Sequence, residues 1–386
     1  MRGRKPGRTT GARMARWGRF VAVVGITVSM TAASTPTVLA ASPMRAAAPA
    51  VAPALSRGSD GLDDRRVPSY TPSQCQGITI NGSGAPAMHK CPSKILFGVT
   101  APPSPQDIAY GLTGAGTNAL VDIASQTGHP VAIAADYQGW AYEPGFNLAQ
   151  AQAAANAGAV EEINWEPWDY AQGVNQPTYS DRAIANGAYD GFLARWAAGA
   201  KAYGEPLFVR FAAEMNGNWD SWAVGVNGNT AADYVAMWRH VYSYVRAQGA
   251  LNVSWVWSPN VSFPGSAPLS EVFPGNDYVD VVALDGYNRG TALSGTQWQS
   301  FTQIFGADLS TLSTLAPTKP IWLAEVGSAE QGGNKAAWVT NLVTQVLSQP
   351  QVVGFAWFNF DQPPIDWSMS SSAPSLSAFQ AALSGH

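Results

Sequence analysis

Eight short apolar runs in the last three quarters of this chain constrain its fold more than any other feature. The runs are mostly apolar and do not alternate regularly with polar residues, which is typical of parallel strands buried on both faces. Segments with helical periodicity lie between most of them, for example at 231–248, 298–315 and 335–347. Repeated strands and helices over residues 94–386 predict a (β/α)8 TIM barrel. The runs are Ile95–Ala101, Val131–Tyr137, Val160–Trp165, Leu207–Ala212, Val253–Trp257, Val279–Leu284, Ile321–Ala324 and Val353–Phe358.

An open doubly wound sheet is the alternative fold for such a pattern. Sheets of that kind that bind dinucleotides place a Gly-x-Gly-x-x-Gly turn directly after the first strand. No such turn follows Ile95–Ala101. The closed barrel is therefore the expected fold.

The first 40 residues have the pattern of a secretory signal peptide. Seven cations and no acid precede an apolar stretch from Phe20 to Met30, and small residues lead to Ala40. That stretch is shorter than the ~20 residues that span a bilayer. We expect cleavage near Ala40 and secretion, with no membrane association afterwards. A permanent membrane anchor is the alternative.

Two short regions separate this leader from the barrel. Residues 41–68 are rich in Ala and Pro and predict a flexible linker. Residues 69–93 hold the only two cysteines, Cys75 and Cys91. In an exported protein this close pair predicts a disulfide, here in a short N-terminal extension of the barrel. A metal site formed with His89 is the alternative.

The charge of the chain points to a neutral partner. Without the seven cations of the leader, 15 basic and 26 acidic side chains remain, a formal net charge of −11. Such a balance argues against nucleic acid or anionic lipid as a partner. The 15 tryptophans exceed what a core needs, and flat indole faces suit sugar rings. The four histidines have no metal-ligand spacing, so we expect no metal, no cofactor and a monomer.

Two glutamates follow apolar runs in equivalent places. Glu214 comes two residues after the fourth run, and Glu325 comes directly after the seventh. The C-terminal ends of barrel strands bear the active site in enzymes of this fold. Paired carboxyl groups there suggest the acid and the nucleophile of a glycosidase. For either glutamate alone, a structural ion pair or an exposed strand end is the alternative.

The residues around these glutamates resemble glycoside hydrolase family 26, from about Phe97 to the C-terminus. That family holds endo-β-mannanases, with some members that cleave β-glucan or β-1,3-xylan. The resemblance implies that Glu214 is the general acid/base, that Glu325 is the nucleophile and that Tyr287 holds Glu325. The motifs are Trp165-Glu-Pro-Trp-Asp169, Phe211-Ala-Ala-Glu-Met-Asn-Gly-Asn-Trp219, Trp238-Arg-His240, Asn252-Val-Ser-Trp-Val-Trp-Ser-Pro-Asn260, Asp285-Gly-Tyr-Asn288, Glu325-Val-Gly327 and Asp366-Trp-Ser368.

Further residues are candidates for binding the substrate or supporting the glutamates. Arg210 and Tyr287 can donate hydrogen bonds to Glu325, although Arg210 could instead pair with Asp136 or Glu166. The resemblance implies that Trp357 lies beneath the bound sugar. Its alternative role is to fill the barrel interior. The remaining candidates form an apolar wall, stack on sugars or bind their hydroxyls, or else pack in loops: Trp219, Trp222, Glu166, Trp168 and Trp140.

One position departs from the family pattern. Family mannanases usually have His directly before the acid/base, whereas this chain has Ala213. We expect a secreted, retaining endo-β-glycosidase that hydrolyses a neutral polysaccharide, β-1,4-mannan first and mixed-linkage β-glucan or β-1,3-xylan next. A non-catalytic carbohydrate-binding protein on the same scaffold and a transglycosylase are the alternatives.

Overall fold

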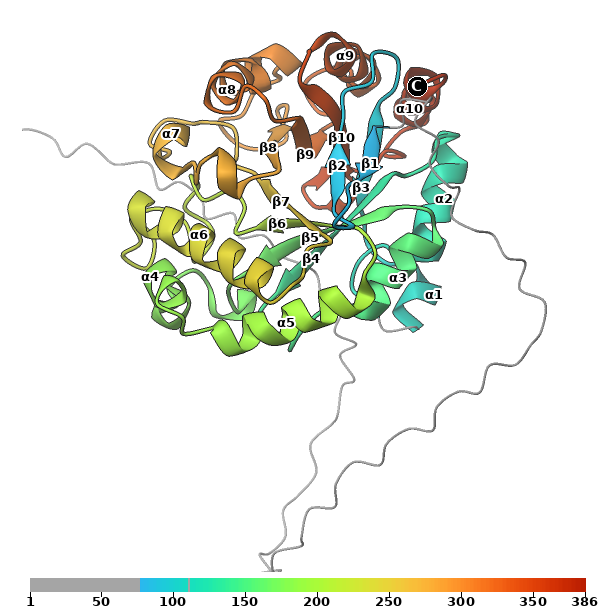
Figure 1. The fold of residues 1–386 in the computed structure, drawn as a ribbon. Coiled ribbons are helices and arrows are strands. Elements are labelled where there is room, and N and C mark those ends of the chain that lie inside the picture. The colour runs from blue at the N-terminus through green and yellow to red at the C-terminus, as the bar shows by residue number, and fades with distance from the viewer. Residues whose placement is uncertain (1–76, 110–111) are drawn as a thin grey trace, which may run out of the picture. The chain divides into compact units, whose positions relative to one another are not determined.

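Eight parallel strands form a closed barrel in the computed structural model, which describes residues 77–109 and 112–386. The strand order is β10-β3-β4-β5-β6-β7-β8-β9, and helices surround the barrel (Figure 1). Each strand overlaps one predicted run, so the predicted TIM barrel is confirmed. The strands are β3 (Leu96–Thr100), β4 (Ile133–Gly139), β5 (Val160–Glu166), β6 (Leu207–Phe211), β7 (Val253–Trp257), β8 (Val281–Asn288), β9 (Ile321–Ser328) and β10 (Val352–Phe358).

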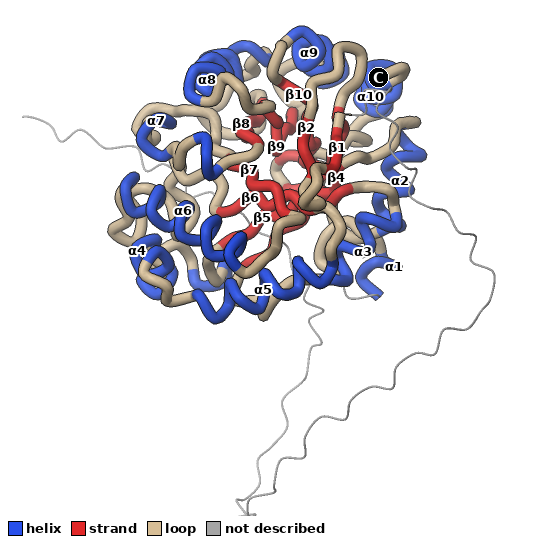
Figure 2. The backbone as a smooth tube through the Cα atoms, in the orientation of Figure 1, coloured by secondary structure: helices blue, strands red, loops and turns tan. Residues whose placement is uncertain are grey.

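The helices lie outside the ring of strands (Figure 2). Two long helices begin at capping boxes, in which the side chain of the first residue and that of the residue three further on bond each other's backbone N–H. Thr230 and Asp233 begin one, and Ser300 and Gln303 begin the other. The helices of the described residues are α1 (Pro105–Ala109), α2 (Thr117–Thr127), α3 (Leu148–Asn156), α4 (Asp181–Ala185), α5 (Asp190–Tyr203), α6 (Ala231–Ala247), α7 (Leu269–Val272), α8 (Phe301–Leu315), α9 (Lys335–Ser348) and α10 (Ala373–Leu383), with 3-10 turns η1 (Tyr170–Gln172), η2 (Pro177–Tyr179) and η3 (Asn276–Tyr278).

The barrel interior changes from apolar to polar along the strands. At the N-terminal ends the inward side chains are apolar, as with Ile133, Phe208 and Val281. Toward the C-terminal ends the same strands turn polar side chains inward. The outer face of every strand packs on helices, and the inner face lines the barrel interior. Both faces are therefore buried, which explains why the runs are mostly apolar. The polar layer is where a site can form.

A small hairpin covers the apolar end of the barrel. It consists of β1 (Ile78–Ile80) and β2 (Pro86–Met88), paired antiparallel. Ile78 and Met88 join the interior cluster, and Lys90 Nζ donates to the carbonyl of Val352 at 2.9 Å, where β10 begins. The hairpin therefore closes the N-terminal end of the barrel, and the C-terminal end remains as the face for a site.

Several N-terminal predictions fall outside the described residues. These are the signal peptide (1–40), the linker (41–68) and the first part of the predicted extension, including Cys75. Cys91 is buried at the end of the hairpin segment. The Cys75–Cys91 disulfide stays a prediction. Within the described ranges, no helix is long and apolar enough to cross a membrane.

Candidate active site

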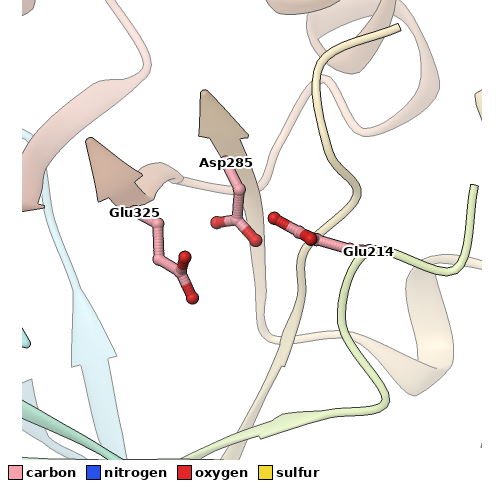
Figure 3. Close-up of side chains that lie close together, drawn as sticks. All are labelled: Glu214, Asp285 and Glu325. Carbon is pink, nitrogen blue, oxygen red and sulfur yellow. The ribbon is translucent and has the colours of Figure 1, made fainter. Parts of the chain in front are cut away.

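Three carboxylates converge at the C-terminal end of the barrel (Figure 3). Asp285 lies in β8, Glu325 in the adjacent β9, and Glu214 in the loop after β6. One oxygen of each lies within 4.8 Å of an oxygen of the other two. All three are buried, with exposed fractions of 3% for Glu214 and 0% for the others. Like charges this close and this buried destabilise one another unless a cation compensates them.

Arg210 supplies that positive charge from β6. Its Nη1 donates to Asp285 Oδ2 at 2.7 Å, and its Nη2 donates to Glu325 Oε1. Its Nε donates to Asn164 Oδ1. Burial alone would lower the pKa of Arg210, but the attraction of Asp285 and Glu325 raises it well above its ordinary value. The guanidinium therefore stays charged. Arg210 pairs with Asp285 and Glu325, and not with Asp136 or Glu166, the alternative partners expected from the sequence.

Glu325 accepts hydrogen bonds from three side chains on three strands. Besides Arg210, Tyr137 donates from β4 to Oε1 at 2.7 Å, and Tyr287 donates from β8 to Oε2. A carboxylate that accepts from a guanidinium and two phenols is stabilised as an anion. Glu325 is thus held ionised and in one orientation.

A β-bulge aims Glu325 at the interior. Trp322 and Ala324 belong to the interior cluster, so strict alternation would turn the next residue outward. The register of β9 shifts at this point against both neighbouring strands, β8 and β10. One extra residue in a strand re-aims the side chain that follows it. Two consecutive residues, Ala324 and Glu325, therefore face inward.

Glu214 stands on backbone that non-glycine residues rarely adopt. Its φ is +56°, and that of Ala212 is +44°, both in the left-handed region. The turn directs the chain back over the barrel after β6. Three hydrogen bonds fix it: Glu214 N to Ser258 O at 2.7 Å, Trp222 Nε1 to Ala213 O at 2.7 Å and Tyr234 OH to Ala212 O at 3.1 Å.

The surroundings of Glu214 differ from those of Glu325. Trp219 Nε1 donates to Glu214 Oε2 at 2.6 Å, and the Trp219 ring packs on Phe263 at 5.7 Å between centroids. An indole is a neutral donor, whereas Glu325 is bound by a cation. Environments that differ in this way let one carboxyl group hold and transfer a proton while the other stays ionised.

The structure brings only some of the other candidate residues to the carboxylates. Arg210, Trp219 and Tyr287 contact the two glutamates directly, as described above. The indoles of Trp222, Trp168 and Trp140 are at most 5% exposed. Trp222 packs on Trp168 at 5.4 Å, and Trp168 Nε1 donates to Glu166 Oε2 at 3.0 Å. Trp140 packs among the outer aromatic residues, including Phe211. Because protein covers their faces, these three support the rim of the barrel and offer no platform for a sugar.

The expected role of Trp357 is wrong for a similar reason. The alternation of β10 turns it outward, where its ring lies 4.7 Å from that of Phe379 in α10. Its Nε1 donates to the carbonyl of Trp367 at 2.8 Å. The next residue, Phe358, faces Tyr287 instead, with ring centroids 5.7 Å apart, and Trp367 lies 5.1 Å from Tyr287. Trp357 therefore fixes the segment that braces Tyr287.

Sequence reasoning missed four polar residues of this layer. Asp285 accepts from Ser258 Oγ at 2.9 Å in addition to Arg210, and Asn164 and Tyr137 contact Arg210 and Glu325. A signal existed for Asp285, because it lies two residues before Tyr287 and so on the same face of its strand. Tyr137 likewise shares the inward face of Ile133. No comparable signal singled out Ser258.

The three carboxylates have the spacing of a possible cation site. Arg210 already lies against Asp285 and Glu325 and supplies the positive charge that an ion would bring. Within the described residues the geometry therefore favours a site that works through its own side chains.

The chain is similar in sequence to several known proteins. The model of glycosyl hydrolase family 26 matches residues 125–338. Endoglucanase H of Acetivibrio thermocellus is 35% identical over 271 residues, which are 69% of this chain and 29% of that protein. Mannan endo-1,4-beta-mannosidase A and B of Caldalkalibacillus mannanilyticus is 31% identical over 150 residues, 37% of this chain and 26% of that protein. This chain thus spans under a third of the length of either relative.

Solved structures share the fold. A modular endo-beta-1,4-mannanase from Cellulomonas fimi aligns with a TM-score of 0.56 at 20% identity, covering 76% of this chain and 71% of that one. A beta-mannanase from Bacteroides ovatus aligns with a TM-score of 0.54 at 19% identity, covering 75% and 88%. At these identities the likeness establishes the barrel fold alone.

Replacing Arg210 by Ala is expected to lower the free energy of unfolding by about 3–5 kcal/mol, because it leaves buried carboxylates uncompensated. The control is Arg182→Ala, whose 70% exposed side chain pairs with Asp233 at 3.2 Å and should change stability by less than about 1 kcal/mol. Chemical denaturation of both variants at one pH measures the difference. Equal effects would show that the buried ion pairs add nothing to stability.

The buried carboxyl group of Glu162 should make the free energy of unfolding depend on pH. Burial raises the pKa of Glu162 to about 7. The positive charge of Arg210, whose Nε lies 3.8 Å from Glu162 Oε1, opposes this shift. Between its ordinary pKa and 7 the folded protein keeps this proton while the unfolded chain releases it, so rising pH destabilises the fold. Glu162→Gln should therefore lose less stability than the wild type between pH 5 and pH 8 in chemical denaturation. A difference between the two proteins that is constant with pH would contradict this assignment.

Proposed function

The chain belongs to glycosyl hydrolase family 26, and from this we propose that it is an endo-acting β-glycosidase that cleaves a neutral β-linked polysaccharide with retention of anomeric configuration. Glu214 serves as general acid/base and Glu325 as nucleophile. The observation that supports this most strongly is the approach of their carboxylate oxygens to within 4.8 Å at the open end of the barrel.

The short separation favours retention over inversion. Retaining enzymes place their two carboxyl groups ~5–5.5 Å apart, so that one can attack the sugar directly. Inverting enzymes need ~6.5–9.5 Å, because a water molecule must fit between the carboxylate and the sugar. Carboxylate oxygens that come within 4.8 Å of each other are closer to the retaining arrangement than to the inverting one.

The reaction proceeds in two steps on these residues. In the first, Glu325 attacks the anomeric carbon, the glycosidic C–O bond breaks, and Glu214 gives its proton to the leaving oxygen. In the second, Glu214 takes a proton from water, which attacks the same carbon and releases Glu325. Arg210, Tyr137 and Tyr287 hold Glu325 ionised and aligned for the first attack. Trp219 holds the Glu214 carboxyl group in place by donating to its Oε2.

β-1,4-Mannan is the first candidate substrate, because curated relatives and solved structures of similar fold bear mannanase names. A β-glucan is the second candidate. Endoglucanase H matches over 69% of this chain, more than the mannanases do, and Ala213 replaces the histidine usual in family mannanases. β-1,3-Xylan remains a third possibility on the resemblance alone.

We further propose that the protein acts outside the cell as a monomer. The basic and apolar leader in residues 1–40 supports secretion, and the acidic balance of the rest of the chain suits an uncharged polymer. Binding without catalysis is the rival function on this scaffold.

The substrate prediction can be checked with a panel of polysaccharides. Purified protein is expected to release reducing ends from β-1,4-mannan or, failing that, from mixed-linkage β-glucan, and the initial products should be oligosaccharides rather than single sugars. Binding to a polysaccharide without new reducing ends would favour the carbohydrate-binding rival. Products longer than an oligosaccharide substrate would indicate transglycosylation.

Separate variants of the two glutamates test their roles. Glu325→Ala should abolish turnover of every substrate, because no nucleophile remains. Glu214→Ala should lose most activity on polysaccharide, by about 10²–10⁴-fold, but far less on an aryl glycoside whose leaving group needs no proton. Circular dichroism confirms that both variants are folded. Full activity of Glu325→Ala, or equal losses of Glu214→Ala on both substrate types, would refute the assignment.

A further inference from the structure

Two stacked tyrosines lie at the C-terminal end of the barrel, on the inner side of β4. Their rings, of Tyr142 and Tyr170, are 4.0 Å apart between centroids and inclined by 18°. Both pack against Gly139, the last residue of β4: a Cβ there would lie 3.3 Å from Tyr142 Cδ2 and 3.3 Å from Tyr170 Cδ1. The two rings therefore occupy the place that a side chain at Gly139 would take.

That place lies next to the reacting centre. Gly139 follows Tyr137 by two residues, so both face the same side of β4. Tyr137 OH donates to Glu325 Oε1. A two-residue step along a strand is about 6.6 Å, so the tyrosine pair lies one layer beyond Tyr137 toward the mouth.

The pair is held in place by the loops that bear it. Tyr142 OH donates to a carboxylate oxygen of Asp169, which also accepts from Ala171 N at 3.0 Å. The backbone of Trp140 donates to Glu166 O at 2.9 Å, which ties the loop after β4 to β5. Tyr142 is nevertheless 44% exposed. One of its faces is covered by Tyr170, and much of the remaining surface of its side chain meets solvent.

The position of the pair selects one side of the cleaved bond. The leaving sugar departs over Glu214, which is flanked by Trp219 and Phe263. The sugar that stays bound is attacked by Glu325, which is flanked by Tyr137. The tyrosine pair follows Tyr137 at the end of β4, and on that contact with Glu325 we assign it to the side of the retained sugar.

We propose that Tyr142 and Tyr170 form a stacking subsite for the second sugar on the non-reducing side, the unit joined to the one that Glu325 attacks. The apolar C–H face of a pyranose ring rests on the exposed aromatic surface. The subsite rests on the proposed function and adds a preference for substrates with at least two sugars on that side of the bond. Its alternative is that the rings only fill space over Gly139.

Two aryl glycosides that share the same leaving group distinguish a stacking subsite from rings that only fill space. We would measure kcat/KM for 4-nitrophenyl β-mannobioside and 4-nitrophenyl β-mannoside, or for the cellobioside and glucoside if the panel identifies a glucan. The ratio of the two values isolates the contribution of the second sugar. Tyr142→Ala is expected to lower this ratio about three- to tenfold, in line with the loss of one aromatic contact, and to leave the monoglycoside unchanged. Tyr142→Phe, which keeps the ring, should restore most of the ratio.

Tyr278→Ala is the matched control. Tyr278 is also a partly exposed tyrosine, but it lies just before β8, at the opposite end of the barrel. Its replacement should leave the ratio unchanged. A wild-type ratio that survives Tyr142→Ala, or equal losses on both glycosides, would overturn the subsite alone. A wild type that hydrolyses neither glycoside would overturn the proposed function and the subsite with it.

Discussion

A single buried cation organises the interior of this barrel. Arg210 lies in a layer of inward side chains that includes Asp285, Glu325 and Glu162, and all four are 0% exposed. Removing such charges from water costs several kcal/mol per ion, and their mutual attraction offsets this only when the geometry is good. A well-packed apolar layer of the same volume would often be as stable or more so. The ion pairs are thus better explained by chemistry than by stability, because they keep Glu325 ionised.

The two glutamates proposed to be catalytic differ mainly in the charge of the groups that donate hydrogen bonds to them. Glu325 is bound by the guanidinium and by two phenols from other strands. Glu214 receives its hydrogen bond from the uncharged Trp219. The same residue type therefore suits two tasks, and the difference arises from side chains on separate strands. A closed barrel brings these strands together at one end, which is why the site needs the whole fold.

The sequence predicted the barrel well, because eight runs buried on both faces leave a clear apolar signal. It also identified Glu214 and Glu325 as the candidate carboxylates. It placed Trp357 wrongly because an apolar run does not reveal which residues face inward, and Phe358 has the inward position instead. The bulge that aims Glu325 was likewise hidden, since alternation counted from Trp322 gives the wrong side. Asp285 and Tyr137 were missed because their importance depends on contacts between strands far apart in the chain.

The left-handed turn that bears Glu214 sets a limit on how far this protein can be stabilised. Residues in such conformations typically cost about 1–3 kcal/mol each, and surrounding contacts hold them in place. Engineering that relaxes Ala212 or Glu214 into ordinary backbone would make the chain more heat-resistant while moving the Glu214 carboxyl group away from Asp285 and Glu325. Thermostable versions are therefore better sought in the helical shell, where rigidity and turnover do not compete.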